Sequence, residues 1–267
     1  MSYQIVVCGS IVPDPLQTLE PVTGLTGPAL KNEMMLPSVL DPWAWHSLFE
    51  AANLAKNAPG SKIYLVSVAP KAKLQQVMMT VGQKVPFELI AVDGPASGFT
   101  DAAEIAPLLA DAIKGILGLD QSQLLVFGGW ESASRGAGST MQIVGELLGI
   151  TNQFQGVDKL TVGADGSLEI LERIEGGKHQ VSQCAGAPAV LGWATGSLPE
   201  PPNNPQIGMQ NMRAIMPALQ KAKPAKVAID AVKFASVALP KQQRQTKIVK
   251  DMSVDEIAKE IVAWVQQ

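Results

Sequence analysis

The stretch from Gln123 to Ile150 constrains the fold of this chain more than any other segment. An apolar run at 124–127 is followed by a loop of small and hydroxylated residues at 128–140, and then by a helix predicted from about Met141. Such a loop lets the backbone come close to a phosphate, and free amides at the start of the helix then point at the anion. The stretch therefore predicts a nucleotide-type ligand at the carboxyl end of an open sheet, with a simple tight turn as the alternative.

Apolar strands alternate with helices through the first half of the chain. We expect strands at 3–12, 62–68, 87–92 and 123–127, and helices at 41–56, 72–82 and 101–117. A Pro- and Gly-rich loop is expected at 13–37. Asp41 followed by Pro42 is a strong helix start, because Asp caps the first amides and Pro suits the first helical position. Alternation at this spacing indicates βαβ units, so the predicted fold class is α/β, with a doubly wound, mostly parallel, Rossmann-like sheet.

The pattern changes after Ile150. Strands at 157–162 and 167–174 flank a Gly-rich turn and a further strand covers 178–184, which together predict an antiparallel meander at 157–185. An apolar strand at 188–193 is expected to rejoin the parallel sheet. The chain ends with a polar linker and a short amphipathic helix that begins at a Ser253–Glu256 capping box. Because so short a helix hardly forms alone, we expect residues 236–267 to be a docking arm and residues 1–235 a domain.

Composition excludes several classes of protein. A net charge of −3 gives no reason to expect nucleic acid or an anionic membrane as partner, and no apolar run approaches the length that spans a bilayer. The two cysteines (Cys8, Cys184) and two histidines (His46, His179) form no metal-ligand spacing and no catalytic triad. The N-terminus leads directly into a strand without a basic leader, so we expect a cytoplasmic, bacterial protein.

Several short motifs follow one another in a fixed order along the chain. They are Asp41-Pro42-Trp43, Val66-Ser67-Val68-Ala69-Pro70, Glu172-Arg173-Ile174-Glu175-Gly176-Gly177, Pro188-Ala189-Val190-Leu191, and a tail with Leu239-Pro240-Lys241 and Lys247-Ile248-Val249. In this order and spacing the chain resembles the small, or beta, subunit of electron transfer flavoproteins. The resemblance implies a fold like that of the adenine nucleotide alpha-hydrolases.

The resemblance also implies a function without catalysis. Beta subunits of the family bind AMP, clamp a larger alpha subunit that carries FAD, and provide the docking surface for flavin-dependent dehydrogenases. The chain would then be the electron carrier subunit of a heterodimer, with AMP as its candidate ligand. The implied nucleotide site consists of Cys8, Asp41, Pro42, Trp43, Ala44, Val68, Gly129, Ser134, Arg135, Gly136, Gly138, Ser139 and Thr140. The Asp-Thr-Ala-Gln run of members that hold a second FAD is absent, so no flavin is predicted in this chain.

Two further roles come from the same resemblance. Trp43 stands where the family has a Phe close to the partner's flavin, and an aromatic ring suits contact with an isoalloxazine. The segment 198–216 resembles the family's recognition loop, in which an exposed Leu anchors the dehydrogenase. Met212 falls on that Leu, so Met209, Met212 and Arg213 are the candidate docking residues.

Two other functions remain open from the residues alone. A stand-alone adenine-nucleotide-binding regulator of the universal-stress type has a similar sheet, although it is usually shorter and needs neither the meander nor the arm. An enzyme that adenylates its substrate is the third option, because Gly128–Ser132 faintly resembles a pyrophosphate loop. In such enzymes, however, that loop follows the first strand.

Overall fold

The computed structural model describes residues 1–24, 27–95, 100–196, 198–226, 236, 238, 241, 246 and 248–266. The chain forms two compact units, residues 1–237 and residues 238–267.

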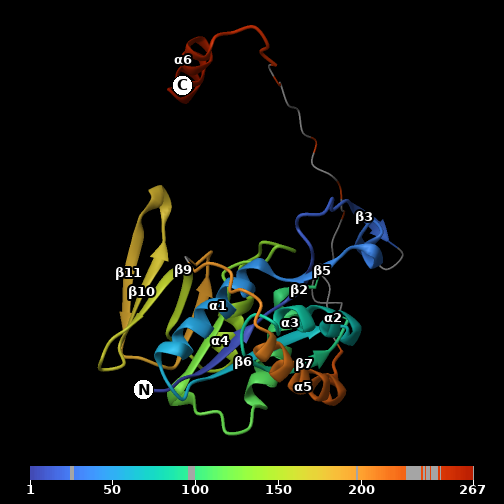
Figure 1. The fold of residues 1–267 in the computed structure, drawn as a ribbon, viewed down its shortest axis with the longest axis vertical. Coiled ribbons are helices and arrows are strands. Elements are labelled where there is room, and N and C mark those ends of the chain that lie inside the picture. Colours follow the sequence, from blue (N-terminus) through green and yellow to red (C-terminus); the bar gives the residue numbers. More distant parts are fainter. Residues whose placement is uncertain are drawn as a thin grey trace. The chain divides into compact units, whose positions relative to one another are not determined.

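The first unit is built on a central sheet that is mostly parallel (Figure 1). Within the described residues the sheet has nine strands, in the order β11-β10-β9-β12-β8-β1-β6-β7-β13. The strands are β1 (Gln4–Cys8), β6 (Lys62–Ala69), β7 (Glu88–Asp93), β8 (Leu124–Gly129), β9 (Gln153–Val162), β10 (Leu168–Arg173), β11 (His179–Cys184), β12 (Ala189–Trp193) and β13 (Lys223–Pro224). In the spatial order β9-β12-β8-β1-β6-β7-β13, each strand pairs in parallel with its neighbours. On the other side of β9, the strands β10 and β11 add an antiparallel meander.

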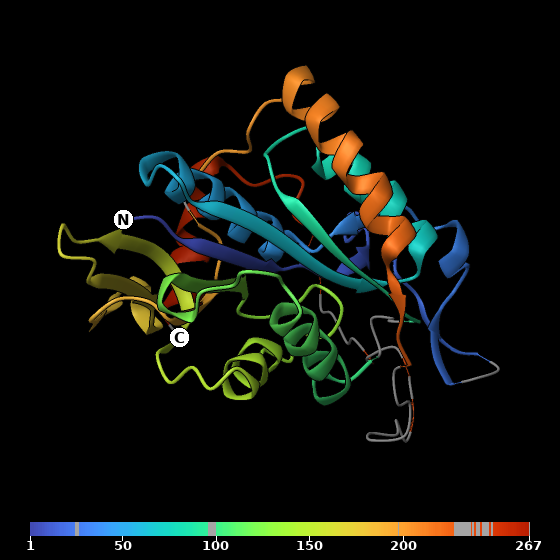
Figure 2. The same ribbon diagram turned by 90° about the horizontal axis from the view of Figure 1, so that it is seen from below.

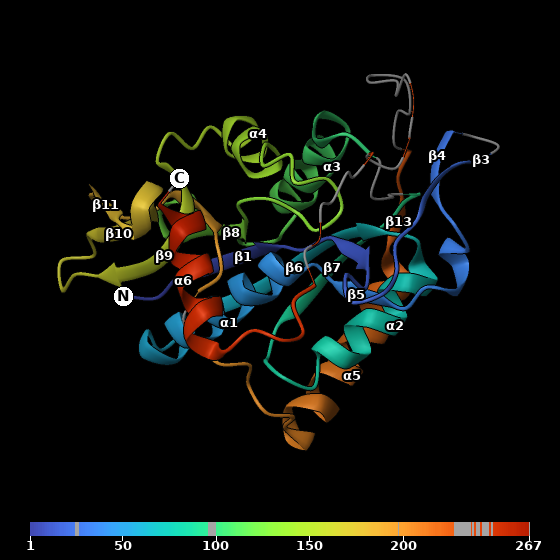
Figure 3. The ribbon, with the colours of Figure 1, turned by 90° about the horizontal axis from the view of Figure 1, so that it is seen from above.

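Helices cover both faces of this sheet, which confirms the doubly wound α/β fold. The helices α1 (Pro42–Asn57), α2 (Lys71–Val81) and α5 (Pro205–Lys221) pack on one face, and α3 (Ala102–Lys114) and α4 (Thr140–Leu147) pack on the other. Figures 2 and 3 show these two layers from opposite sides. Successive residues of β1 enter opposite cores, Ile5 on the α1 side and Val6 on the α3 side, so the strand is apolar from Ile5 to Cys8.

Local signals place the helix starts as predicted. Asp41 caps α1, and its carboxylate accepts a hydrogen bond from the amide of Trp43 at 3.1 Å. Asp101 and Glu104 form a capping box at the start of α3. The apolar strand predicted at 188–193 is β12, and it lies between β8 and β9 in the parallel sheet, as expected.

The predicted first strand at 3–12 is wrong in one respect, because it breaks after Cys8. The second piece, β2 (Ile11–Pro13), leaves the central sheet and pairs with β5 (Ser38–Leu40). The break lies at Gly9, where a Cβ atom would come within 2.8 Å of the Leu40 side chain. A side chain at this position would therefore displace the Leu40 side chain, which packs over the end of β1.

Two segments expected to be loops carry regular structure. The Pro- and Gly-rich stretch after residue 13 contains the hairpin β3 (Pro21–Gly24) and β4 (Gly27–Leu30), followed by a 3-10 turn at Glu33–Met35. The recognition loop expected at 198–216 is helical from Pro205 onward, because Asn204 caps α5 and Pro205 occupies its first turn. The docking candidates therefore lie on a helix instead of a loop.

The second unit contains one helix among its described residues, α6 (Val254–Val265). The predicted capping box is present, with the Ser253 and Glu256 side chains bonded to each other's backbone amides. None of the α6 residues is buried. The family-like positions 239, 240 and 247 lie outside the described residues. In the part of the chain that the structure describes, no helix is both long enough and apolar enough to cross a bilayer.

Candidate functional site

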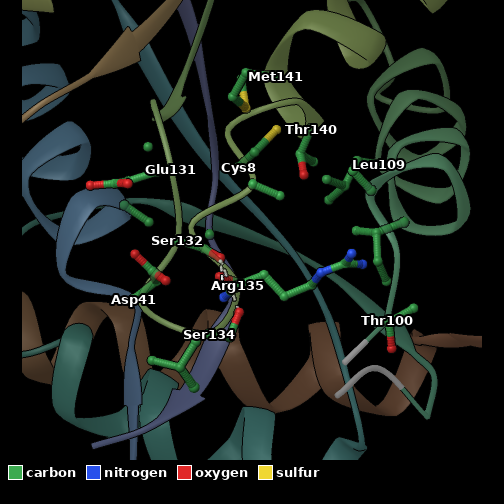
Figure 4. Close-up of a pocket in the computed structure, with 18 of the residues that line it drawn as sticks. Cys8, Asp41, Thr100, Leu109, Glu131, Ser132, Ser134, Arg135, Thr140 and Met141 are labelled. Carbon is green, nitrogen blue, oxygen red and sulfur yellow. Dashed lines mark hydrogen bonds between the residues drawn. The ribbon is translucent and has the colours of Figure 1, made fainter. Parts of the chain in front are cut away.

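A pocket lies where the carboxyl ends of β1, β6 and β8 meet the starts of α1, α3 and α4 (Figure 4). Nine of the thirteen residues in the predicted nucleotide site line it: Cys8, Asp41, Ala44, Val68, Gly129, Ser134, Arg135, Gly138 and Thr140. The other four predicted residues, Pro42, Trp43, Gly136 and Ser139, are close in sequence but do not line the pocket. The structure therefore brings most of the predicted residues together around one cavity.

The pocket also contains residues outside the predicted set of thirteen. They come from the end of β1 (Gly9, Ser10), from β2 (Ile11, Val12), from α3 and the residue before its cap (Thr100, Ala102, Ile105, Leu109), and from the loop and α4 (Glu131, Ser132, Ala137, Met141). The α3 wall follows from topology. A right-handed crossover after β7 places the next helix against the face of β6 and β1, beside the crevice.

Glycines bring the loop after β8 close to two helices. A Cβ atom at Gly129 would lie 2.6 Å from the Cβ of Trp43 on α1, and one at Gly128 would collide with the sulfur of Met141 on α4. Gly138 has a φ of +67°, and a Cβ there would lie 2.9 Å from the Trp130 carbonyl oxygen. The close approach therefore requires glycine at positions 129 and 138, whereas at Gly128 the obstacle is the flexible end of the Met141 side chain.

Asp41 ties the loop to the start of α1. One carboxylate oxygen accepts the Trp43 amide at 3.1 Å, and the other accepts the amide of Ala133, in the loop, at 2.9 Å. The residue is 2% exposed. Burial raises the pKa of Asp41 above its ordinary value, although the hydrogen bonds that the carboxylate accepts oppose the shift. Asp41 therefore has a structural role: it holds the loop after β8 against the start of α1.

Replacing Asp41 with alanine should lower the free energy of unfolding by about 2–4 kcal/mol, from the lost helix cap and a buried amide left without a partner. Separately, because burial raises the folded-state pKa, the folded protein keeps the Asp41 proton to a higher pH than the unfolded chain does. The difference in stability between wild type and variant should therefore be largest below the unfolded pKa of about 3.9 and decrease as the pH rises through the folded-state pKa. Urea unfolding at several pH values measures it. Asp120→Ala is the matched control, because Asp120 caps an exposed 3-10 turn. An equal loss of unfolding free energy in the two variants would contradict this structural role of Asp41.

Arg135 crosses from the loop to the start of α3. Its guanidinium donates to the Asp101 carboxylate at 2.8 Å, and the two side chains are 24% and 21% exposed. The hydrogen bond from the Ala103 amide is the main cause that lowers the pKa of Asp101, and Arg135 lowers it further. Figure 4 shows Arg135 reaching toward the α3 side of the pocket. The pair therefore joins two walls of the pocket that are 34 residues apart in sequence.

The start of α4 provides free donors beside this pair. The first amides of a helix have no partner inside the helix, and Ser139 contributes no side-chain cap. Thr140, with its hydroxyl group, lines the pocket at this point. Cys8 lines the same pocket from the end of β1, close to Thr140 and Met141 (Figure 4). Burial raises the pKa of its thiol to about 12, so it carries no charge at neutral pH. The donor set of this pocket suits an anion held at the start of α4.

A second surface lies on the exposed face of α5. Met209, Met212 and Met216 are 59%, 48% and 37% exposed, and Arg213 is exposed beside them. The opposite face is buried. There, Asn211 donates to the carbonyl oxygens of Gly82 and Val85 at 2.7 and 2.8 Å, and Ile215 and Leu219 enter the core. The helix is therefore held firmly by one face, and its methionines belong to the surface instead of the core.

Comparison with known proteins adds one positive finding. The family model of the electron transfer flavoprotein domain matches residues 32–234. A search of curated proteins found no match. The matched range contains α1, the loop after β8, the meander and α5.

Proposed function

The chain belongs to the electron transfer flavoprotein domain family, and from this premise we propose that it is the beta subunit of a heterodimeric electron transfer flavoprotein in the cytoplasm. The match over residues 32–234 carries the proposal. In this role the chain performs no catalysis. It supports an alpha subunit that holds most of the FAD contacts, and it brings a flavin-dependent dehydrogenase to that subunit.

The C-terminal unit supports a role in a heterodimer. We propose that residues 236–267 are an arm that docks on the alpha subunit. The helix α6 buries none of its residues, although Val254, Ile261 and Trp264 are strongly apolar and 82%, 54% and 61% exposed. A 12-residue helix with an apolar face is stable only when that face is covered. A subunit that wraps a partner needs such an arm, whereas a stand-alone regulator does not.

The pocket at the sheet edge is proposed to hold an adenine nucleotide such as AMP. Its phosphate would be held by the first amides of α4, by Thr140 and by Arg135, with the strand-end backbone near Cys8 and Val68 beside the base. The volume of the cavity is about 120 Å³. Sites for drug-sized ligands are usually about 300–1,000 Å³. A nucleotide would therefore fill the cavity with one part and extend beyond it with the rest.

A glycine substitution tests this nucleotide site. We expect Gly138→Ala to lower the nucleotide content of the purified complex by at least about tenfold, because the added methyl group meets the Trp130 carbonyl and displaces the loop before α4. Gly149→Ala is the matched control, because Gly149 also has a positive φ, of +70°, but has open space around it. Chromatography of the nucleotide released by acid gives the content. Equal content in both variants, or none in the wild type, would reject the site.

Docking of the dehydrogenase is proposed on α5, with Met209, Met212 and Arg213 as the contacts. Methionine side chains are flexible and polarizable, which suits a surface that must bind and release its partner in each cycle. Trp43 is proposed to lie near the flavin of the alpha subunit. It is partly buried at the first turn of α1 and packs against Gly129.

The assembly itself is open to a direct test. The chain, tagged in its native host and purified gently, should elute as a one-to-one complex with a larger subunit when the mass is measured by light scattering. A homo-oligomer of this chain alone would favour the stand-alone regulator instead.

A further inference from the structure

Three thioethers share one exposed face of α5. Met209, Met212 and Met216 follow one another at i, i+3 and i+7, a spacing that aligns side chains along a helix. They are 59%, 48% and 37% exposed. Because Asn211, Ile215 and Leu219 form the buried face, the methionine face can react without unfolding the helix.

A thioether in such a position reacts with hydrogen peroxide. The sulfur attacks one peroxide oxygen and the O–O bond breaks, so methionine becomes methionine sulfoxide and the other oxygen leaves as water. The sulfur loses the two electrons that the peroxide gains. The product is polar where the thioether was apolar, and methionine sulfoxide reductases restore it.

We propose that Met209, Met212 and Met216 form a reversible oxidation site that turns off docking on α5. This inference rests on the proposed docking role of the helix. A docked partner covers the methionines with apolar surface, and a sulfoxide oxygen buried there without a hydrogen bond opposes binding. Oxidation of this methionine stripe (Met209, Met212 and Met216) would therefore weaken association with the dehydrogenase on the order of tenfold or more.

Other methionines of the chain provide internal controls. Met78 and Met141 are 0% and 3% exposed and should resist peroxide. Met34 and Met35 are 98% and 84% exposed, but they lie on the 3-10 turn before β5 and not on α5. They should be oxidised without effect on docking. The effect of oxidation on docking should therefore depend on the position of a methionine on α5, and not on its exposure alone.

The experiment uses the purified heterodimer and a dehydrogenase that reduces it. Peptide mass spectrometry after graded hydrogen peroxide should show sulfoxide at Met209, Met212 and Met216 before Met78 and Met141. The apparent KM of the dehydrogenase for the carrier should rise about tenfold over the same range and recover with methionine sulfoxide reductases A and B. In the variant Met209→Leu/Met212→Leu/Met216→Leu, the ratio of treated to untreated KM should stay near one. The variant Met34→Leu/Met35→Leu should remain as sensitive as the wild type.

The outcomes separate this inference from the docking assignment. If Met212→Glu raises KM but oxidation of all three methionines does not, docking on α5 stands and the oxidation site is rejected. If neither change alters KM, both are rejected. Equal peroxide sensitivity of the triple leucine variant and the wild type would also reject the oxidation site.

Discussion

Removal of residues 253–267 should abolish stable association with the alpha subunit while leaving residues 1–237 folded. The deletion removes α6, whose residues are all at least partly exposed and which belongs to a separate compact unit. Burying a large apolar side chain contributes about 1.5–3 kcal/mol, and Val254, Ile257, Ile261 and Trp264 lie on one face. Loss of this face should weaken the heterodimer by at least about 4 kcal/mol, or roughly a thousandfold in Kd.

The arm is tested by measuring Kd for the truncated and full chains by calorimetry or surface binding, together with the unfolding curve of each. Trp264→Glu should reproduce much of the loss, because it places a charge on the apolar face. Lys259→Gln is the matched control on the charged side of the same helix. An unchanged Kd after truncation would show that α6 does not hold the partner.

A charge at the centre of the methionine stripe should have the second large effect. Met212→Glu is expected to raise the KM of the dehydrogenase for the carrier by at least about tenfold, because docking would bury an unpaired carboxylate. Met212→Ala should act in the same direction but more weakly, since it removes only apolar contact. Flavin content should not change in either variant, because Met212 lies on the exposed face of α5. Stopped-flow reduction of the heterodimer measures the effect.

Gln220→Glu is the control for this experiment. It places the same charge at an exposed position of the same helix, two turns further along. Wild-type kinetics in the Met212→Glu variant would show that α5 is not part of the docking surface. A matching loss in Gln220→Glu would mean that charge alone, and not the methionine stripe, controls association.

Much of the fold was predictable because its signals are local. Parallel strands buried on both faces, such as 124–127, appear as continuous apolar runs, and the caps at Asp41, Asp101 and Ser253 define helix starts. The break after Cys8 was not predictable, because it depends on the pairing of β2 with β5, a strand that lies much further along the chain. The hairpin of β3 and β4 was missed because its Pro and Gly content is typical of a loop.

The candidate site, too, was predictable only where its signals are local. The loop at 128–140 was recognisable from its composition alone. Its contact with α3 depends on the ion pair between Arg135 and Asp101, which no local pattern indicates. The helix α5, by contrast, could have been predicted, because Asn204 followed by Pro205 is the same kind of start signal as Asp41 followed by Pro42.

The visible absorbance of the gently purified, tagged chain tests the central claim most directly. We expect a yellow complex with a flavin spectrum, in which this chain and a larger subunit are present in equal amounts and the flavin is bleached by a dehydrogenase and its substrate. A colourless preparation that contains only this chain would contradict it.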